Sequence, residues 1–130
     1  CSRVAFGYQA GCTGQGTNTV AIGLQAGATG QGNNSVAIGY GAGANTQGAG
    51  AVAIGSCSIS WGQGANSIAI GWQAGSGGFF SAQAGCSIII DATGIASTST
   101  NSGFFVKPIR YAGTCYPLYY NQCTGEITFG

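Results

Sequence analysis

Charge is almost absent from this sequence of 130 residues. It contains three Lys or Arg residues and two Asp or Glu residues, and the stretch from 4 to 90 has none of them. Because no basic patch exists, nucleic acid is not expected as a partner. No apolar run approaches the roughly 20 residues of a membrane-spanning helix, so direct insertion into a membrane is not expected either.

Catalytic and metal-binding groups are equally scarce. Histidine is absent, which excludes Ser-His and Cys-His pairs. The only carboxylates, Asp91 and Glu126, are far apart in the sequence, which argues against the paired acids of a glycosidase. None of the six cysteines forms a C-x-x-C pair, which argues against zinc. We therefore expect no enzyme, no metal and no cofactor, and interpret Asp91 as a turn or capping residue.

What the sequence has in abundance is glycine, 26 residues of it, arranged in a repeat. Lines of 16 residues begin at positions 4, 20, 36 and 52 with V-A-[FI]-G. A fifth line, 68–87, is four residues longer, and a sixth, 88–103, keeps the apolar start but has Asp91 in place of the glycine. A fixed period of this length is typical of a solenoid.

Alternating apolar residues at the start of each line predict a short strand. Stacking the lines pairs equal columns at about 4.8 Å spacing, so the fold class is all-β, a β-solenoid of about 16-residue coils. We expect the first and third columns to form interior apolar ladders, in which Ile38 lies between its counterparts in the neighbouring lines. The ladder residues are Val4, Val20, Val36, Val52, Ile68, Phe6, Ile22, Ile38, Ile54 and Ile70.

A glutamine followed by glycine recurs four times in the twelfth column. We interpret this column as a structural amide ladder rather than a recognition site. Its members are Gln15, Gln31, Gln47 and Gln63.

The string NSVAIGYGAGA at 34–44 resembles the YadA-like head repeat of trimeric adhesins, and the likeness extends over about residues 4–87. The resemblance implies a left-handed parallel β-roll, three chains of which pack into one head. Small residues in the second, fourth, seventh and eighth columns are consistent with close approach of three backbones. We therefore expect a homotrimer.

The sequence changes character beyond 101, where aromatic residues become frequent. NSGFFVKPIR at 101–110 and LYYNQCTGEI at 118–127 are similar to a module of large-DNA-virus and phage fibre or tail proteins. Residues 117–129 predict a hairpin with a turn at Thr-Gly, and Cys115 and Cys123 are candidates for a disulfide if their strands pair.

These patterns predict three parts: β-roll repeats over 1–87, a terminal coil and transition over 88–102, and a fibre-type β module with a hairpin over 103–130. We expect 88–90 to be the last strand of the roll or a transition strand, and the enlarged loop of 76–87, with Phe79 and Phe80, to cover the final coil, since open sheet edges invite association.

Exposed aromatic residues beside glutamines are suited to contacts with sugars, and Tyr8, Tyr40 and Trp72 are weak candidates for them. The sequence favours a fibre or head segment on a virion surface that contacts other particle proteins and supports attachment to a host surface, with a host glycan as a further candidate partner. The alternative is the head of a bacterial trimeric adhesin on the cell surface. A third reading, an ice-binding solenoid, is weaker because only Thr13 and Thr29 form its threonine row.

Overall fold

The computed structural model describes residues 2–77, 82–109 and 117–129. These residues form strands connected by turns, and none of them is helical. The strands are β1 Arg3–Phe6, β2 Thr19–Ile22, β3 Thr29–Gln31, β4 Val36–Ile38, β5 Asn45–Gln47, β6 Val52–Ile54, β7 Ile68–Ile70, β8 Ser87–Asp91, β9 Gly103–Lys107, β10 Leu118–Tyr120 and β11 Ile127–Phe129.

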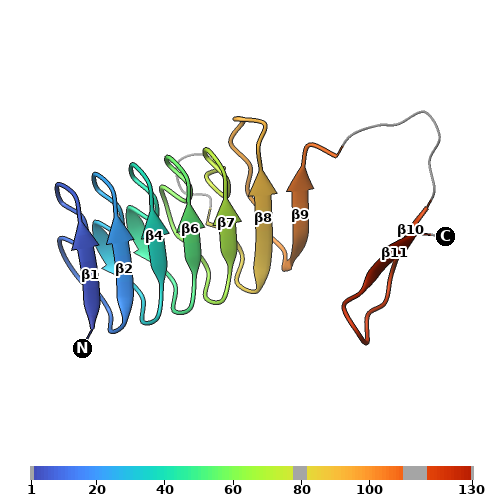
Figure 1. Ribbon diagram of the computed structural model, residues 1–130, viewed down its shortest axis with the longest axis horizontal. Helices are drawn as coiled ribbons and strands as arrows, with labels where there is room; N and C mark the ends of the chain where they lie inside the picture. The colour runs from blue at the N-terminus through green and yellow to red at the C-terminus, as the bar shows by residue number, and fades with distance from the viewer. Residues whose placement is uncertain (1, 78–81, 110–116, 130) are drawn as a thin grey trace.

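One parallel sheet runs along the whole stack of coils (Figure 1). Its strand order is β1-β2-β4-β6-β7-β8-β9, and each strand pairs with the strand one coil further along the chain. The register joins equal columns, as in Val20 with Val36 and Ile22 with Ile38. The period of the sequence thus corresponds to one turn of the solenoid, and the predicted all-β parallel fold class is confirmed.

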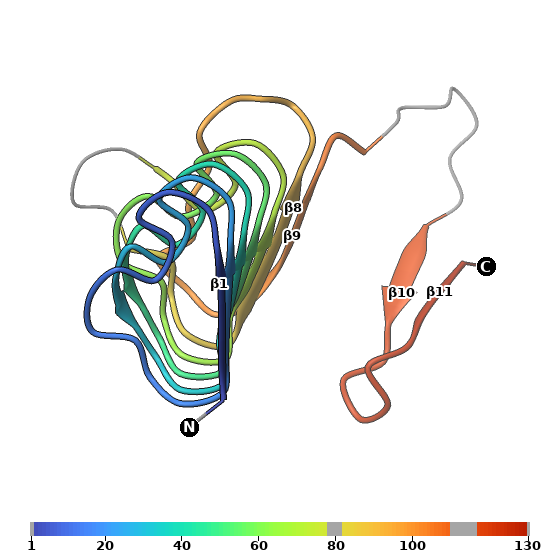
Figure 2. The same cartoon turned by 60° about the vertical axis from the view of Figure 1, so that its left-hand side comes forward.

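A second, narrower sheet on another side of the coil consists of β3 and β5. Isolated parallel bridges extend it, from Thr13 to Thr29 at one end and from Gln47 through Gln63 to Gln83 at the other. Figure 2 shows the coils nested behind one another around a narrow interior. Asn45 of β5 follows Thr29 in this row, so only Thr13 and Thr29 are threonines.

The glycine after each VAI strand is required by the stacking of the coils. Gly39 has φ +123°, and a Cβ added there would lie 2.8 Å from the carbonyl carbon of Gly55 in the next coil. Gly23 and Gly55 have the same geometry toward their own neighbours. Only glycine tolerates both this backbone conformation and this approach, which explains why the fourth column is constant over five lines.

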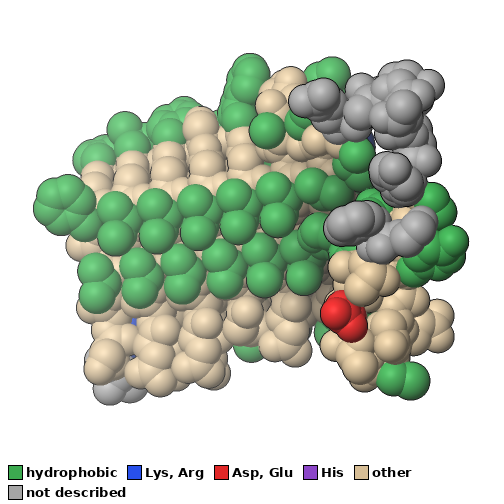
Figure 3. All heavy atoms as spheres, turned by 45° about the vertical axis from the view of Figure 1, so that its right-hand side comes forward, with side chains coloured by type: hydrophobic (Ala, Val, Ile, Leu, Met, Phe, Trp, Pro, Cys, Tyr) green, Lys and Arg blue, Asp and Glu red, His purple; other side chains and the backbone are tan. Residues whose placement is uncertain are grey.

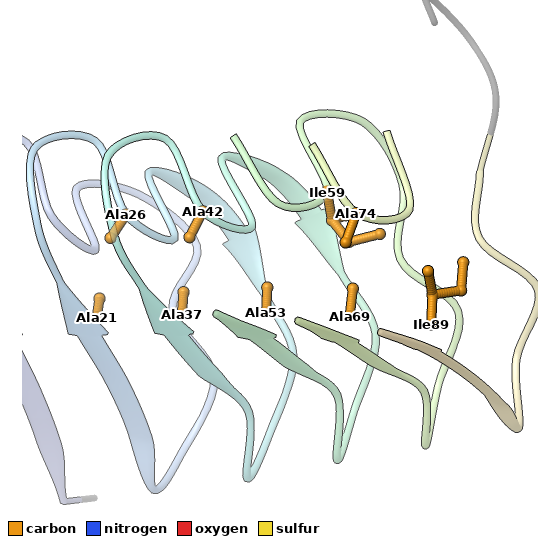
Figure 4. Packing of buried hydrophobic residues seen from close by; sticks show 9 residues of the cluster. All are labelled: Ala21, Ala26, Ala37, Ala42, Ala53, Ile59, Ala69, Ala74 and Ile89. Carbon is orange, nitrogen blue, oxygen red and sulfur yellow. The ribbon is translucent and has the colours of Figure 1, made fainter. Parts of the chain in front are cut away.

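Alanine supplies most of the apolar interior, and Ile59 and Ile89 complete it. Ala37 and Ala53 of the sheet are fully buried, and so is Ala42 on the opposite wall of the coil. Figure 4 shows the sheet alanines in a row beneath a second row of buried side chains. The expectation that Ile38 lies in the interior is therefore wrong, although it does pair with Ile22 and Ile54. Around Ala37 and Ala53 the coil is so narrow that its two walls meet over methyl groups, and the larger side chains of these strands point outward.

Glutamine amides make up the polar part of the interior. Gln31, Gln47 and Gln63 are at most 4 % exposed. Each donates from Nε2 to the carbonyl of the first-column residue of its own coil, at 2.9 Å to Val20, 2.8 Å to Val36 and 2.9 Å to Val52. Amide-to-amide hydrogen bonds of 2.9 Å from Gln15 to Gln31 and 3.1 Å from Gln47 to Gln63 link successive coils. The predicted structural ladder is present, and it ties the two walls of each coil together.

The ladder has a fifth member, Gln83, that the sequence columns missed. It is buried, accepts from Gln63 Nε2 at 3.2 Å and donates to the Ile68 carbonyl at 3.0 Å. The four extra residues of the fifth line precede this glutamine and shift it out of the column. The signal in the sequence is the string QAGCS at 83–87, which has the same layout as QGNNS at 31–35.

The roll extends further than predicted. β9 pairs in parallel with all five residues of β8, so the main sheet continues to Lys107. Ile88–Ile90 is therefore not the last strand of the roll, because 103–107 supplies one more parallel strand, although none of its residues is buried. The predicted hairpin is present as β10 and β11, which are antiparallel. Phe79 and Phe80 lie outside the described residues.

Candidate interaction surface

The outer face of the main sheet is a continuous apolar surface. The first and third residues of each VAI strand alternate with the buried alanine, so they point away from the interior. Figure 3 shows two adjacent rows of hydrophobic side chains that run along the roll. We call this surface the outer ladder face.

All ten predicted ladder residues lie on the outer ladder face, and its exposure is greatest at the ends. Val4 is 52 % and Phe6 75 % exposed in the first coil, and Ile70 is 36 % exposed. The other members, Val20, Val36, Val52, Ile68, Ile22, Ile38 and Ile54, are half-buried by their neighbours in the same rows. Beyond them the rows continue through Ile88 to Phe104 and through Ile90 to Val106. The face thus spans seven strands, a length of about 29 Å at the usual strand spacing.

The predicted sugar-contact residues lie on the edge that follows each strand. Tyr8 is 71 % exposed, and Tyr40 and Trp72 are each 55 % exposed. Next to them, Gln25 Nε2 donates to Gln9 Oε1 at 3.0 Å. The structure therefore places the three aromatic rings along one edge, each two coils from the next, rather than gathering them in a pocket.

Asp91 is buried at the end of β8. Its Oδ1 accepts hydrogen bonds from the Thr93 backbone amide at 2.8 Å and from Thr93 Oγ1. Burial alone raises the pKa of this carboxyl, but the hydrogen bonds from Thr93, together with the Ser97 hydroxyl and the charge of Lys107, outweigh burial and lower the pKa below its ordinary value of 3.8. Hydrogen bonds that close a turn two residues long are consistent with the predicted capping role.

The lowered pKa of Asp91 predicts acid sensitivity. The unfolded carboxyl takes up a proton at higher pH than the folded one, so the stabilisation is present above about pH 3.8 and is lost as the pH falls further. We expect the melting temperature, followed by circular dichroism, to decrease as the pH is lowered below about 3.8. This decrease should be smaller in Asp91→Asn. Glu126→Gln, which removes an exposed carboxylate, is the control and should leave the fall in place. An unchanged acid response in Asp91→Asn would contradict the assignment.

The described cysteines are free thiols: Cys12, Cys86 and Cys123 are exposed and Cys57 is half-buried. Cys123 lies in the turn between β10 and β11 rather than in a strand, and Cys115 lies outside the described residues. The bridge between these two residues stays a prediction. Within 2–77, 82–109 and 117–129, no cluster of three or more metal-ligating side chains is present. The same ranges contain no helix that is long and apolar enough to cross a membrane.

Comparison with known proteins finds one likeness, and it lies in the repeats. The family model of the YadA head domain repeat matches residues 15–42, 31–56 and 63–75. No curated protein and no solved structure matches the chain. The matched stretches are those in which a VAI or IAI strand, a glycine at positive φ and a buried glutamine recur in register. Residues 15–56 and 63–75 of the parallel solenoid are therefore similar to the YadA head repeat.

Proposed function

We propose that this chain is a structural head segment of a surface protein, in which three copies pack through their outer ladder faces and display the remaining sides of the roll to a host surface. The observation that carries the proposal is the position of the Val and Ile columns. They lie outside the roll, where a single chain leaves them in contact with water.

Burial of this face is the physical driving force for assembly. Contiguous apolar patches of more than a few hundred Å2 are rare on monomeric proteins and mark interaction sites. The outer ladder face has no charged side chain between Val20 and Ile90, so its burial leaves no charge without a partner. The likeness to YadA head repeats favours three parallel copies, with the valine and isoleucine rows of each chain against those of its neighbours.

Ile38→Asp tests this assembly. Ile38 is half-buried in the single chain, so an aspartate there remains hydrated in a monomer but would be buried without a partner in the trimer. We expect light scattering to give three chain masses for the parent protein and a single chain mass for the variant, because an unpaired buried charge costs several kcal/mol at each of three contacts.

Asn33→Asp is the matched control for Ile38→Asp. It adds the same charge at an exposed position, away from the outer ladder face, and retains the side-chain oxygen that accepts from the Thr17 amide. It should remain trimeric. A parent protein that scatters as a monomer or a dimer would contradict the proposal, as would a trimeric Ile38→Asp variant.

The segment is proposed to lie either on a bacterial cell surface or on a virion. The YadA-like repeats favour the bacterial cell surface, whereas the likeness of about residues 102–129 to fibre modules of large DNA viruses and phages favours a virion. Immunogold labelling with an antibody against the roll, applied to whole cells and to purified particles of the source, distinguishes these locations. Label found only inside cells would contradict both.

The exposed rings of Tyr8, Tyr40 and Trp72 support a host glycan as the ligand of this segment. Tyr8, Tyr40 and Trp72 follow their strands at one edge of the outer ladder face and are exposed in the single chain, and we expect assembly through that face to leave them accessible. Binding of the parent to a glycan array, reduced by Tyr40→Ala but not by Asn33→Asp, is the expected result. Equal binding by both variants would remove this edge from the proposal.

A further inference from the structure

The β10–β11 hairpin is a two-stranded sheet without a core of its own. Leu118, Tyr119, Tyr120 and Ile127 are all more than half exposed. The strand pairing places Tyr120 opposite Ile127 and Leu118 opposite Phe129, so Leu118, Tyr120 and Ile127 share one face. An isolated hairpin is at best marginally stable in water, and this one therefore needs a surface to cover its apolar face.

A matching apolar surface lies on β9. Phe104 is 53 % exposed, and the strand pairing places it and Val106 at the end of the two rows of the outer ladder face. In both views of the chain the hairpin stands clear of the roll (Figures 1 and 2). Between β9 and the hairpin lies a hollow of about 840 Å3, lined mainly by Phe104, Val106, Leu118, Tyr120 and Ile127. A hollow of this size is open to solvent, so the apolar side chains along it stay in contact with water in the single chain.

We infer that the β10–β11 hairpin packs on β9 of a neighbouring copy, with Leu118, Tyr120 and Ile127 against Phe104 and Val106 of that copy. This inference rests on the proposed trimer. In three parallel copies all β9 strands lie at the same end of the assembly, and Figure 1 shows the hairpin beyond that end, so it lies near the β9 strands of the other copies as well as its own.

Two further observations favour exchange between chains. Residues 110–116 connect Ile109 to Pro117, and seven residues reach at most about 25 Å when extended, which is enough to cross to an adjacent roll about 10 Å away. The apolar rows also run without interruption from the coils into Phe104 and Val106. The hairpin contact therefore continues the interface that the rows form. The exchange would fasten the three chains at the end of the roll.

Disulfide trapping between two different chains tests the exchange. One chain carries Phe104→Cys and an affinity tag, and the second carries Ile127→Cys and a longer tag. Both have Cys115 and Cys123 replaced by serine. The two chains are co-expressed and oxidised. We expect a band on a non-reducing gel at the summed mass of the two chains, detected through both tags and lost on reduction.

Thr128→Cys is the matched control, because Thr128 pairs with Tyr119 and so lies on the opposite face of β11. It should give little of the linked band, and chains with only one of the two substitutions should show the background from the other cysteines. A chain that carries both Phe104→Cys and Ile127→Cys should form links between chains rather than within one chain.

The outcomes separate the two proposals. A bridge formed only within the doubly substituted chain, or no bridge at all, overturns the exchange while three chain masses by light scattering still support the proposed function. A parent that scatters as a monomer overturns the proposed function first. Equal linkage at positions 127 and 128 also overturns the exchange, since the apolar face would then not direct the contact.

Discussion

Ala37→Asp is expected to prevent the coil from closing. Ala37 is fully buried and packs in the cluster that contains Ala21, Ala42 and Ala53. The neighbouring cluster is apolar, and no positive charge lies between residues 4 and 90 to compensate a carboxylate. An uncompensated buried charge costs about 3–5 kcal/mol, which is a large part of the 5–15 kcal/mol that typically stabilises a folded domain. We expect loss of the strand signal in circular dichroism, or a melting temperature far below that of the parent at equal protein concentration.

Ala5→Asp is the matched control, because Ala5 occupies the same column of the repeat but is exposed in the first coil. A surface substitution of this kind changes stability by about 0.5 kcal/mol or less. Comparable destabilisation by the two variants would mean that burial of the alanine column does not decide the effect. A folded Ala37→Asp variant would show that the sheet faces the other way.

Gln47→Leu is expected to destabilise the roll by about 2–4 kcal/mol although the volume of the side chain hardly changes. The lost amide donates to the Val36 carbonyl at 2.8 Å, to the Ala51 carbonyl at 3.3 Å and to Gln63 Oε1 at 3.1 Å. Each net hydrogen bond contributes about 1 kcal/mol, and a buried acceptor that loses its donor adds a desolvation cost. Denaturant unfolding followed by circular dichroism at fixed concentration measures the difference.

Gln15→Leu is the control at the end of the same ladder. Gln15 is half-buried and donates to Gln31 Oε1 at 2.9 Å, so water can replace the lost partner. We expect at most about 1 kcal/mol of destabilisation there. A stable Gln47→Leu variant would show that the interior accepts an apolar column and that the amides are not needed to join the two walls of the coil.

The sequence by itself determined the repeat unit and its register. Equal columns had to stack, because a 16-residue period with one short strand per line leaves only the neighbouring lines as pairing partners. The fourth-column glycines and the glutamine ladder followed from the same stacking. Gln83 was missed because four inserted residues displaced it from its column, and the contact between coils restores the alignment.

Which side of the strand faces inward was decided only by the tertiary structure. Alternation separates Ala37 from Val36 and Ile38, but all three are apolar, so polarity gives no direction. The width of the coil decides: beside Ala37 the opposite wall, with Ala42, is close, and alanine methyl groups fill the space between. The larger residues are therefore placed outside, and a pattern that resembles a core becomes a surface. In the same way, the sequence assigns Phe104 and Val106 to a separate module. The pairing of β9 with β8 instead places them at the end of the outer ladder face.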